Sequence, residues 1–278
     1  MMKNKRGLFA VPYVGWMAFF VIAPIIMVVI YAFTSGATDG SLGSFTFDNF
    51  SQMTAYAVVF GRSFKLAIIA TLVCLLIGYP VAYMISRENE RFQRIAMVLI
   101  MLPMWMNFLL RTYSWLSILE NNGLLNQFFR AIGVIDLYNS IFGTNIEYFR
   151  MIGSQGAVVL GMVYNYLPFM ILPIYSVIVK LDHSLLEAAR DLGASSTVVF
   201  RRVIFPLSLP GIISGFLLVF IQSLEDFSNP ATIGGDYTTL SIEVYQIITG
   251  SYDMQKGSVL ALLLLLPAVT AYLLNNYW

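Results

Sequence analysis

Cysteine and histidine are almost absent from this 278-residue sequence, which has one of each, Cys74 and His183. A single cysteine forms neither a disulfide framework nor a thiolate metal site within one chain. A single histidine removes most hydrolytic and metal-dependent chemistry, because such sites combine several ligands or set a histidine beside a nucleophile. We therefore expect no catalytic residues, no metal ligands and no enzyme activity in this chain.

Charge is also scarce: 11% of the residues are charged, whereas 58% are hydrophobic. Soluble domains usually carry about 25% charged residues. Sixteen basic and fifteen acidic residues are too few to cover a globular surface that faces water, so lipid must surround much of the chain. The basic residues form no stripe outside short loops, which argues against nucleic acid as a partner.

Long apolar runs are what the sequence has instead. A bilayer core of about 30 Å requires roughly 20 apolar residues in a helix. Six runs meet this requirement, at residues 10–33, 64–85, 95–119, 156–179, 206–224 and 259–274. The first exceeds the about 7–15 residues of a signal-peptide core, so it is predicted to be a retained helix. The sequence thus predicts an all-α membrane protein with six transmembrane helices in a single transmembrane domain, residues 1–278.

Lysine and arginine are distributed unevenly among the loops, and this asymmetry predicts the orientation. With the N-terminus inside, ten of the sixteen basic residues lie in three cytoplasmic segments: 1–9, 86–94 and 180–205. Both termini are therefore expected in the cytoplasm. Long outer loops remain at residues 34–63, 120–155 and 225–258. Apolar residues at helical spacing predict short surface helices over residues 123–132 and 240–249.

The cytoplasmic link between the fourth and fifth spans reads LDHSLLEAARDLGASSTVVFRRVIFPLSLP from Leu181 to Pro210. Ser184 and Glu187 have the spacing of a capping box, which predicts a helix start. A narrow apolar face follows, made of Leu185, Ala188, Ala189 and Leu192. Gly193 is expected to take the left-handed conformation that ends a helix.

A second short helix is then predicted, capped by Ser195, Ser196 or Thr197 and running to Arg202. Pro206 and Pro210 would lie in the first turns of the next span, where proline is less disruptive. Two short helices at an angle suit a groove on a soluble partner. An amphipathic helix at the lipid interface is the alternative that the local pattern leaves open.

Five residues of this link resemble the EAA signature of ABC importer permeases: Glu187, Ala188, Ala189, Gly193 and Pro206. The resemblance implies the type I ABC importer permease (MetI-like) fold, in which residues 181–205 would form the coupling segment that docks into the ATP-binding subunit. The chain departs from the family pattern at Val203 and Phe205, and both replacements are apolar.

The family also implies partners, which are ATP-binding cassette ATPase subunits, a second permease subunit and an extracytoplasmic substrate-binding protein. ATP would be used by the partner ATPase, and this chain would bind no cofactor. The sequence has no G-x-x-x-x-G-K-[ST] phosphate loop. The implied location is the bacterial inner (plasma) membrane, which the chain would cross several times. Permeases of this family usually end in a basic tail, and this sequence ends at Trp278 without one. The resemblance therefore leads us to expect that the chain is a fragment.

Three further stretches resemble particular importers. Residues 102–126 and 166–175 are similar to the spermidine/putrescine (PotB-type) permease family, and this similarity covers roughly residues 60–220. Residues 223–235, SLEDFSNPATIGG, are instead similar to permeases for ferric iron or 2-aminoethylphosphonate. The first resemblance implies that the chain forms half of a translocation path for a small cationic solute, a polyamine. The second keeps iron and aminoethylphosphonate as alternatives.

Polar and aromatic residues near span ends are the candidates for this path: Trp105, Asn107, Arg111, Tyr113, Tyr164, Gln222, Glu225 and Asp226. Adjacent carboxylates can attract a polyamine or ligate iron, and aromatic rings bind amines through cation–π contacts. Each candidate also has a plainer interpretation. The carboxylates would lie in an aqueous loop, Arg111 would form a salt bridge or snorkel to headgroups, and the aromatic residues would belong to the interfacial belt.

Two other classes of protein remain as alternatives. An ion-coupled secondary transporter usually has internal repeats and more spans, and this sequence has neither. An intramembrane enzyme would need a catalytic constellation, for which the sequence offers carboxylates alone.

Overall fold

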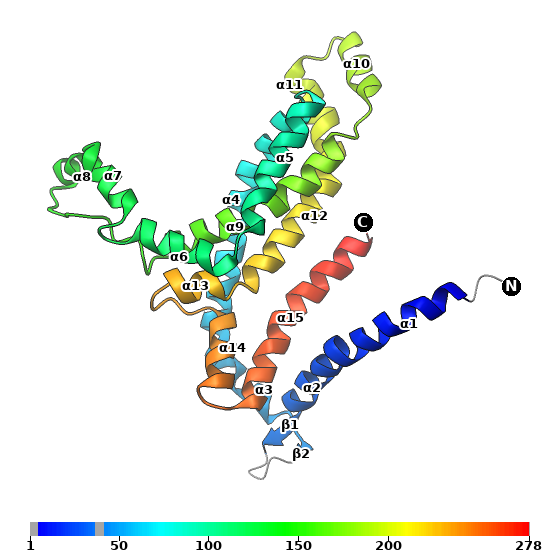
Figure 1. The fold of residues 1–278 in the computed structure, drawn as a ribbon, viewed down its shortest axis with the longest axis vertical. Coiled ribbons are helices and arrows are strands. Elements are labelled where there is room, and N and C mark those ends of the chain that lie inside the picture. Colours follow the sequence, from blue (N-terminus) through cyan, green and yellow to red (C-terminus); the bar gives the residue numbers. More distant parts are fainter. Residues whose placement is uncertain (1–4, 37–41, 278) are drawn as a thin grey trace. The chain divides into compact units, whose positions relative to one another are not determined.

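A computed structural model describes residues 5–36 and 42–277 of the chain, nearly all of them in helices (Figure 1). By their contacts these residues divide into two compact units. The first comprises Met1–Phe60 and Leu240–Pro267, and the second Gly61–Thr239 and Ala268–Trp278. The division falls inside two long helices, α4 (Ala57–Ser86) and α15 (Met254–Tyr277).

The first unit begins with an apolar helix whose residues are mostly exposed. α1 (Lys5–Met17) continues through a wide π-turn (Ala18–Ile22) into α2 (Ala23–Ala32). The most apolar stretch of this helix, within Val11–Ala32, has no buried residue. An uncovered apolar helix requires lipid or another protein as its surroundings.

A short hairpin and two small helical turns connect α2 to α4. β1 (Thr34–Gly36) pairs antiparallel with β2 (Leu42–Phe45). α3 (Asp48–Ser51) and a 3-10 turn (Gln52–Tyr56) follow. The unit is completed by α14 (Leu240–Thr249), whose buried Leu240 and Ile247 pack with Leu260 of α15.

The core of the second unit lies between three long helices, α4, α9 (Gln155–Ile178) and α12 (Phe205–Leu224). α9 and α12 approach closely because glycine faces the contact. A Cβ atom at Gly211 would lie 2.8 Å from the carbonyl oxygen of Pro173, and one at Gly215 would lie 3.0 Å from the sulfur of Met170. Small residues at helix contacts are typical of packing in membranes, where close van der Waals contact replaces the hydrophobic effect.

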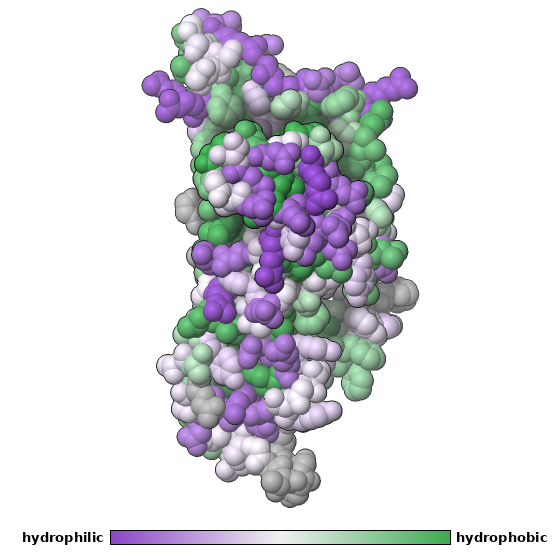
Figure 2. All heavy atoms as spheres, turned by 90° about the vertical axis from the view of Figure 1, so that its left-hand side faces the viewer, coloured by the Kyte–Doolittle hydropathy of each residue, from purple (hydrophilic) through white to green (hydrophobic). Residues whose placement is uncertain are grey.

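Shorter helices of the second unit lie at the two ends of these long helices. α10 (His183–Asp191) and α11 (Ser196–Val199) connect α9 to α12 at one end. α7 (Leu124–Ala131), α8 (Val134–Phe142) and α13 (Ser228–Ile233) lie at the other end (Figure 1). α7 and α14 confirm the short helices expected over residues 123–132 and 240–249. Hydrophilic side chains are exposed at the end that carries α10 and α11, as they are elsewhere on the face that Figure 2 shows.

The third predicted span, residues 95–119, consists of two helices rather than one. α5 (Glu90–Trp105) and α6 (Phe108–Leu119) are separate, and the chain bends by 90° between them. Pro103 removes one backbone donor near the end of α5, and Asn107 starts a new helix by accepting from the amides of Leu109 and Leu110, at 2.9 and 3.4 Å. In the described part of the chain, five helices are long and apolar enough to span a membrane, or six with this bent pair counted as one span.

The predicted end of the second cytoplasmic helix at Arg202 is also wrong. α11 passes through a π-turn (Phe200–Ile204) into α12, and the helix is continuous from Ser196 to Leu224. Pro206 follows the π-turn directly. A proline clashes with the preceding helical turn and lacks a donor there, and a wider turn before it gives the ring room.

Candidate functional site

α10, the helix predicted to form the coupling segment, begins at an aspartate rather than at the predicted capping box. The Asp182 side chain accepts from the backbone amide of Ser184 at 2.9 Å, and the helix starts at His183. The predicted pairing of Ser184 with Glu187 is therefore wrong. Asp182 lies two residues nearer the end of α9, and an aspartate caps a helix as well as a serine does.

The end of α10 is a Schellman turn, as the glycine predicted. Gly193 has a φ of +82° and donates to the carbonyl of Arg190 at 2.8 Å. Ala194 donates to the carbonyl of Ala189 at 3.1 Å. These two bonds satisfy carbonyls that the helix end would otherwise leave free. The chain thus reverses sharply between α10 and α11.

One face of α10 carries exposed apolar side chains. Leu185 and Ala188 are exposed, and Leu192 has 89% of its surface exposed. Their spacing of three and four residues places them on one side of the helix. Glu187, also exposed, lines a neighbouring pocket. An exposed apolar stripe is a typical protein-binding surface.

A pocket of about 580 Å³ lies between α10 and the link from α4 to α5. Its lining comes from the ends of α4 and α9 as well, and includes Tyr83, Arg87, Glu187 and Arg190. One side of α10 therefore faces a cavity, which Leu186, Glu187 and Arg190 help to line.

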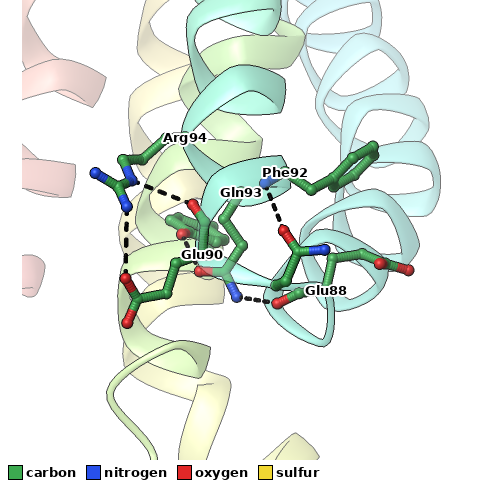
Figure 3. Close-up of polar contacts among 7 residues, drawn as sticks. Glu88, Glu90, Phe92, Gln93 and Arg94 are labelled. Atoms are coloured by element: carbon green, nitrogen blue, oxygen red, sulfur yellow. Dashed lines mark hydrogen bonds and ion pairs between the residues drawn. The ribbon is translucent and has the colours of Figure 1, made fainter.

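The α4–α5 link itself is tied to α9 by Gln93 (Figure 3). The Gln93 amide donates to the carbonyls of Glu88 at 2.7 Å and Ser86 at 3.2 Å. Its oxygen accepts from the hydroxyl of Tyr175 in α9 at 2.8 Å. One side chain therefore closes the link and fastens it to a neighbouring helix.

Local contacts also fix the start of α5 in this link. The Asn89 side chain caps the helix by accepting from the amide of Phe92 at 2.9 Å. Glu90 and Arg94 pair at 3.5 Å one helical turn apart (Figure 3). Both partners are exposed, so the ion pair adds little stability.

Arg111, predicted to line the path, is buried at the corner between α5 and α6. Its guanidinium donates to the carbonyl of Pro103 at 2.7 Å and lies over the rings of Phe108 and Tyr164, at 5.4 and 5.9 Å. Its Nε atom is buried without a hydrogen-bond partner among the described residues. A cation at the end of α5 complements the helix dipole. Arg111 thus helps to hold the corner.

The other predicted path residues on α5, α6 and α12 are solvent- or lipid-accessible. Trp105 is 76% exposed, and Tyr113 and Gln222 are exposed as well. Asn107 is exposed and uses its side-chain oxygen as the cap of α6. Asn107 and Arg111 therefore have different roles here, since Asn107 caps α6 and Arg111 is buried at the corner.

The two adjacent carboxylates have different surroundings. Glu225 is exposed at the end of α12, whereas Asp226 is 5% exposed. Asp226 accepts from the backbone amides of Ser228 and Asn229, at 3.0 and 3.1 Å, and from the Asn229 side chain at 2.6 Å. The hydroxyl of Tyr166 is a further partner. Burial raises the pKa of Asp226, and the hydrogen bonds from these groups act in the opposite direction because they favour the charged form.

Sequence reasoning missed several polar residues that organise these two regions: Gln93, Asn165, Tyr175 and Asn229. Asn165 carried a usable signal, because an amide inside an apolar span is costly and usually has a specific partner. The partner itself, Asn229, lies 64 residues away and shows no periodic pattern.

Comparison with known proteins identifies the family. The model of the family described as "Binding-protein-dependent transport system inner membrane component" matches residues 74–277. The spermidine/putrescine transport system permease protein PotB of Salmonella typhimurium strain SL1344 is 36% identical, with 100% of this chain and 95% of that protein aligned. PotB of Haemophilus influenzae is 40% identical over 80% of this chain and 75% of that protein.

Solved structures agree on the fold. The crystal structure of a bacterial ABC transporter involved in the import of the acidic polysaccharide alginate has a chain that superposes with a TM-score of 0.75. The superposition covers 99% of this chain and 97% of the other at 16% identity. The chain accordingly has the type I (MetI-like) ABC importer permease fold and is a multi-pass membrane protein. It belongs to the family of binding-protein-dependent transport system inner membrane components, which are transport permeases and not enzymes.

Proposed function

We propose that this chain is one of two permease subunits of an ATP-driven importer and forms half of the translocation path for a polyamine such as spermidine or putrescine. The observation that carries the proposal is the 36% identity to a spermidine/putrescine permease along the whole chain. The alternatives, ferric iron and 2-aminoethylphosphonate, have the support of residues 223–235 alone. The predicted single membrane domain, with both termini in the cytoplasm, belongs to the same proposal.

In this scheme a binding protein delivers substrate at the end of the helices that carries α13, and ATPase subunits dock at α10. The exposed stripe of Leu185, Ala188 and Leu192 supports the docking role of α10. ATP is bound and hydrolysed by the partner ATPase, and this chain binds no cofactor. When the two ATPases close, the coupling helices approach each other and the spans alternate between inward-facing and outward-facing states.

Glu225 is the carboxylate that we assign to attraction of the cationic substrate. Its side chain is exposed at the end of α12, whereas the Asp226 carboxylate already accepts several hydrogen bonds from the protein. Two opposite charges about 4 Å apart attract by about 1 kcal/mol in water and by several times that in a confined site.

The test is uptake by the complete complex in proteoliposomes that contain Glu225→Gln. Uptake of spermidine and putrescine should fall about fivefold or more, which corresponds to about 1 kcal/mol, while ATPase association stays unchanged. Asp236→Asn is the matched control, because Asp236 is another exposed acid of the same unit. Ferric iron and 2-aminoethylphosphonate are assayed in parallel. Wild-type complexes that import aminoethylphosphonate but no polyamine, with Glu225→Gln fully active, would contradict the cationic path.

A further inference from the structure

α13 packs against the first turns of α9, and residues at both ends of α13 contact it. The Gly153 amide, just before α9, donates to the carbonyl of Ile233 at 2.9 Å. Gly161 of α9 lies beneath α13, where a Cβ atom would be 2.7 Å from Asn229 Oδ1 and 3.0 Å from Ile233 Cδ1. One turn further along α9, Asn165 reaches Asn229 itself. The absence of a side chain at Gly161 is what permits this approach.

Three polar side chains form a hydrogen-bond relay, in which each side chain donates to the next. Asn165 Nδ2 donates to Asn229 Oδ1 at 3.3 Å, and Asn229 Nδ2 donates to Asp226 Oδ2 at 2.6 Å. Asn165, Asn229 and Asp226 have 3%, 0% and 5% of their surfaces exposed. The bond at the carboxylate is charge-assisted and short, as strong hydrogen bonds are. A buried relay of this kind is favourable only when its groups meet in one arrangement.

Apolar contact alone would hold α13 against α9, so the buried polar groups need another explanation. Polar side chains buried between apolar helices are costly unless they are paired. Pairing makes the contact selective for one register of α13, whereas an apolar contact tolerates sliding. Asp226 also receives the first amides of α13, so the relay fixes the start of α13 as well as its position on α9.

Glu225 is placed by the same contacts. Its amide donates to the carbonyl of Ile221 at the last turn of α12, at 3.1 Å, and the next residue is the anchored Asp226. The Glu225 backbone therefore has one fixed neighbour on each side. We propose that Asp226, Asn229 and Asn165 are positioning residues that hold the Glu225 carboxylate at the mouth of the path; this inference rests on the proposed function.

The test combines a variant that pushes the relay apart with a matched control in the same helix. Gly161→Ala places a methyl group against Asn229, whereas Gly156→Ala meets only the Ser154 hydroxyl at an ordinary 3.8 Å. Asn165→Leu, which removes the first donor, serves as the second variant in case Gly161→Ala does not fold. Hydrogen exchange of the α13 amides should accelerate about tenfold in Gly161→Ala and Asn165→Leu and stay unchanged in Gly156→Ala.

Uptake by the complete complex then measures whether the relay acts through Glu225. Each relay variant alone should raise the KM for polyamine uptake severalfold without lowering ATPase association. Combined with Glu225→Gln, the relay variants should add nothing further, because the group that they position is already neutral. A purely structural role predicts additive losses instead, and additive losses would overturn the proposal.

Failure of the proposed function gives a different result. If the wild-type complex imports no polyamine, the substrate assignment is wrong, and the same combination of variants is measured with the substrate that is imported. Unchanged exchange of α13 in both Gly161→Ala and Asn165→Leu overturns the positioning role whatever the substrate is.

Discussion

Replacement of Gly193 by another residue is limited by the backbone conformation and not by lack of space. Its φ is +82°, and nothing lies within 4 Å of the place where a Cβ atom would be. We expect Gly193→Val to destabilise the turn after α10 by about 1–3 kcal/mol, because β-branched residues avoid the left-handed region. The chain should still insert into the membrane, but co-purification of the ATPase subunits and transport should be lost.

Gly193→Asn is the matched control for this turn, since asparagine adopts the left-handed conformation with little strain. It should retain ATPase association close to that of the wild type. If Gly193→Val associates and transports normally, the coupling role of this turn is wrong.

At the scale of the element, the corner between α5 and α6 is held by Arg111 and by the Asn107 cap, and the cap can be tested separately. Asn107 supplies the acceptor for two amides at the start of α6. We expect Asn107→Ala to destabilise the start of α6 by about 1 kcal/mol, with faster hydrogen exchange at Leu109 and Leu110. Asn107→Asp keeps an acceptor and should leave exchange near the wild-type rate. Equal exchange in all three proteins would show that the corner does not need its cap.

At the scale of the whole molecule, the orientation in the membrane is open to a labelling test. Tags at residue 1 and at Trp278 should be accessible only from the cytoplasm, and Ser140→Cys in α8 should react with an aqueous maleimide from outside. Ser140 is chosen because it is exposed, whereas the neighbouring Asn139 binds Ile146 and Thr144. Cys74 is buried and should stay unlabelled. Reversed labelling would exchange the roles assigned to the α10 and α13 ends.

The parts of the fold that sequence could predict are those with a local cause. Apolar runs predicted the long helices, and the left-handed preference of glycine predicted the turn at Gly193. The corner at Asn107 was missed because the apolar run continues across it. Hydropathy therefore predicts one span, although the Asn107 cap begins a second helix. The contact between Asn165 and Asn229 was missed because it joins residues that only the folded chain brings together.

The helix that runs without interruption from Ser196 to Leu224 has a mechanical consequence. Twenty-nine residues at about 1.5 Å per residue make a rod of about 44 Å, with the turn after α10 at one end and Glu225 at the other. If such a rod pivots near its first turn by about 5°, its far end moves by about 4 Å. A displacement of about this size is enough to bring two opposite charges into contact or to separate them. A small tilt of the helix at α11 would therefore produce a larger displacement at Glu225. The contacts that hold α13 on α9 limit how far the Glu225 carboxylate moves with the end of the helix.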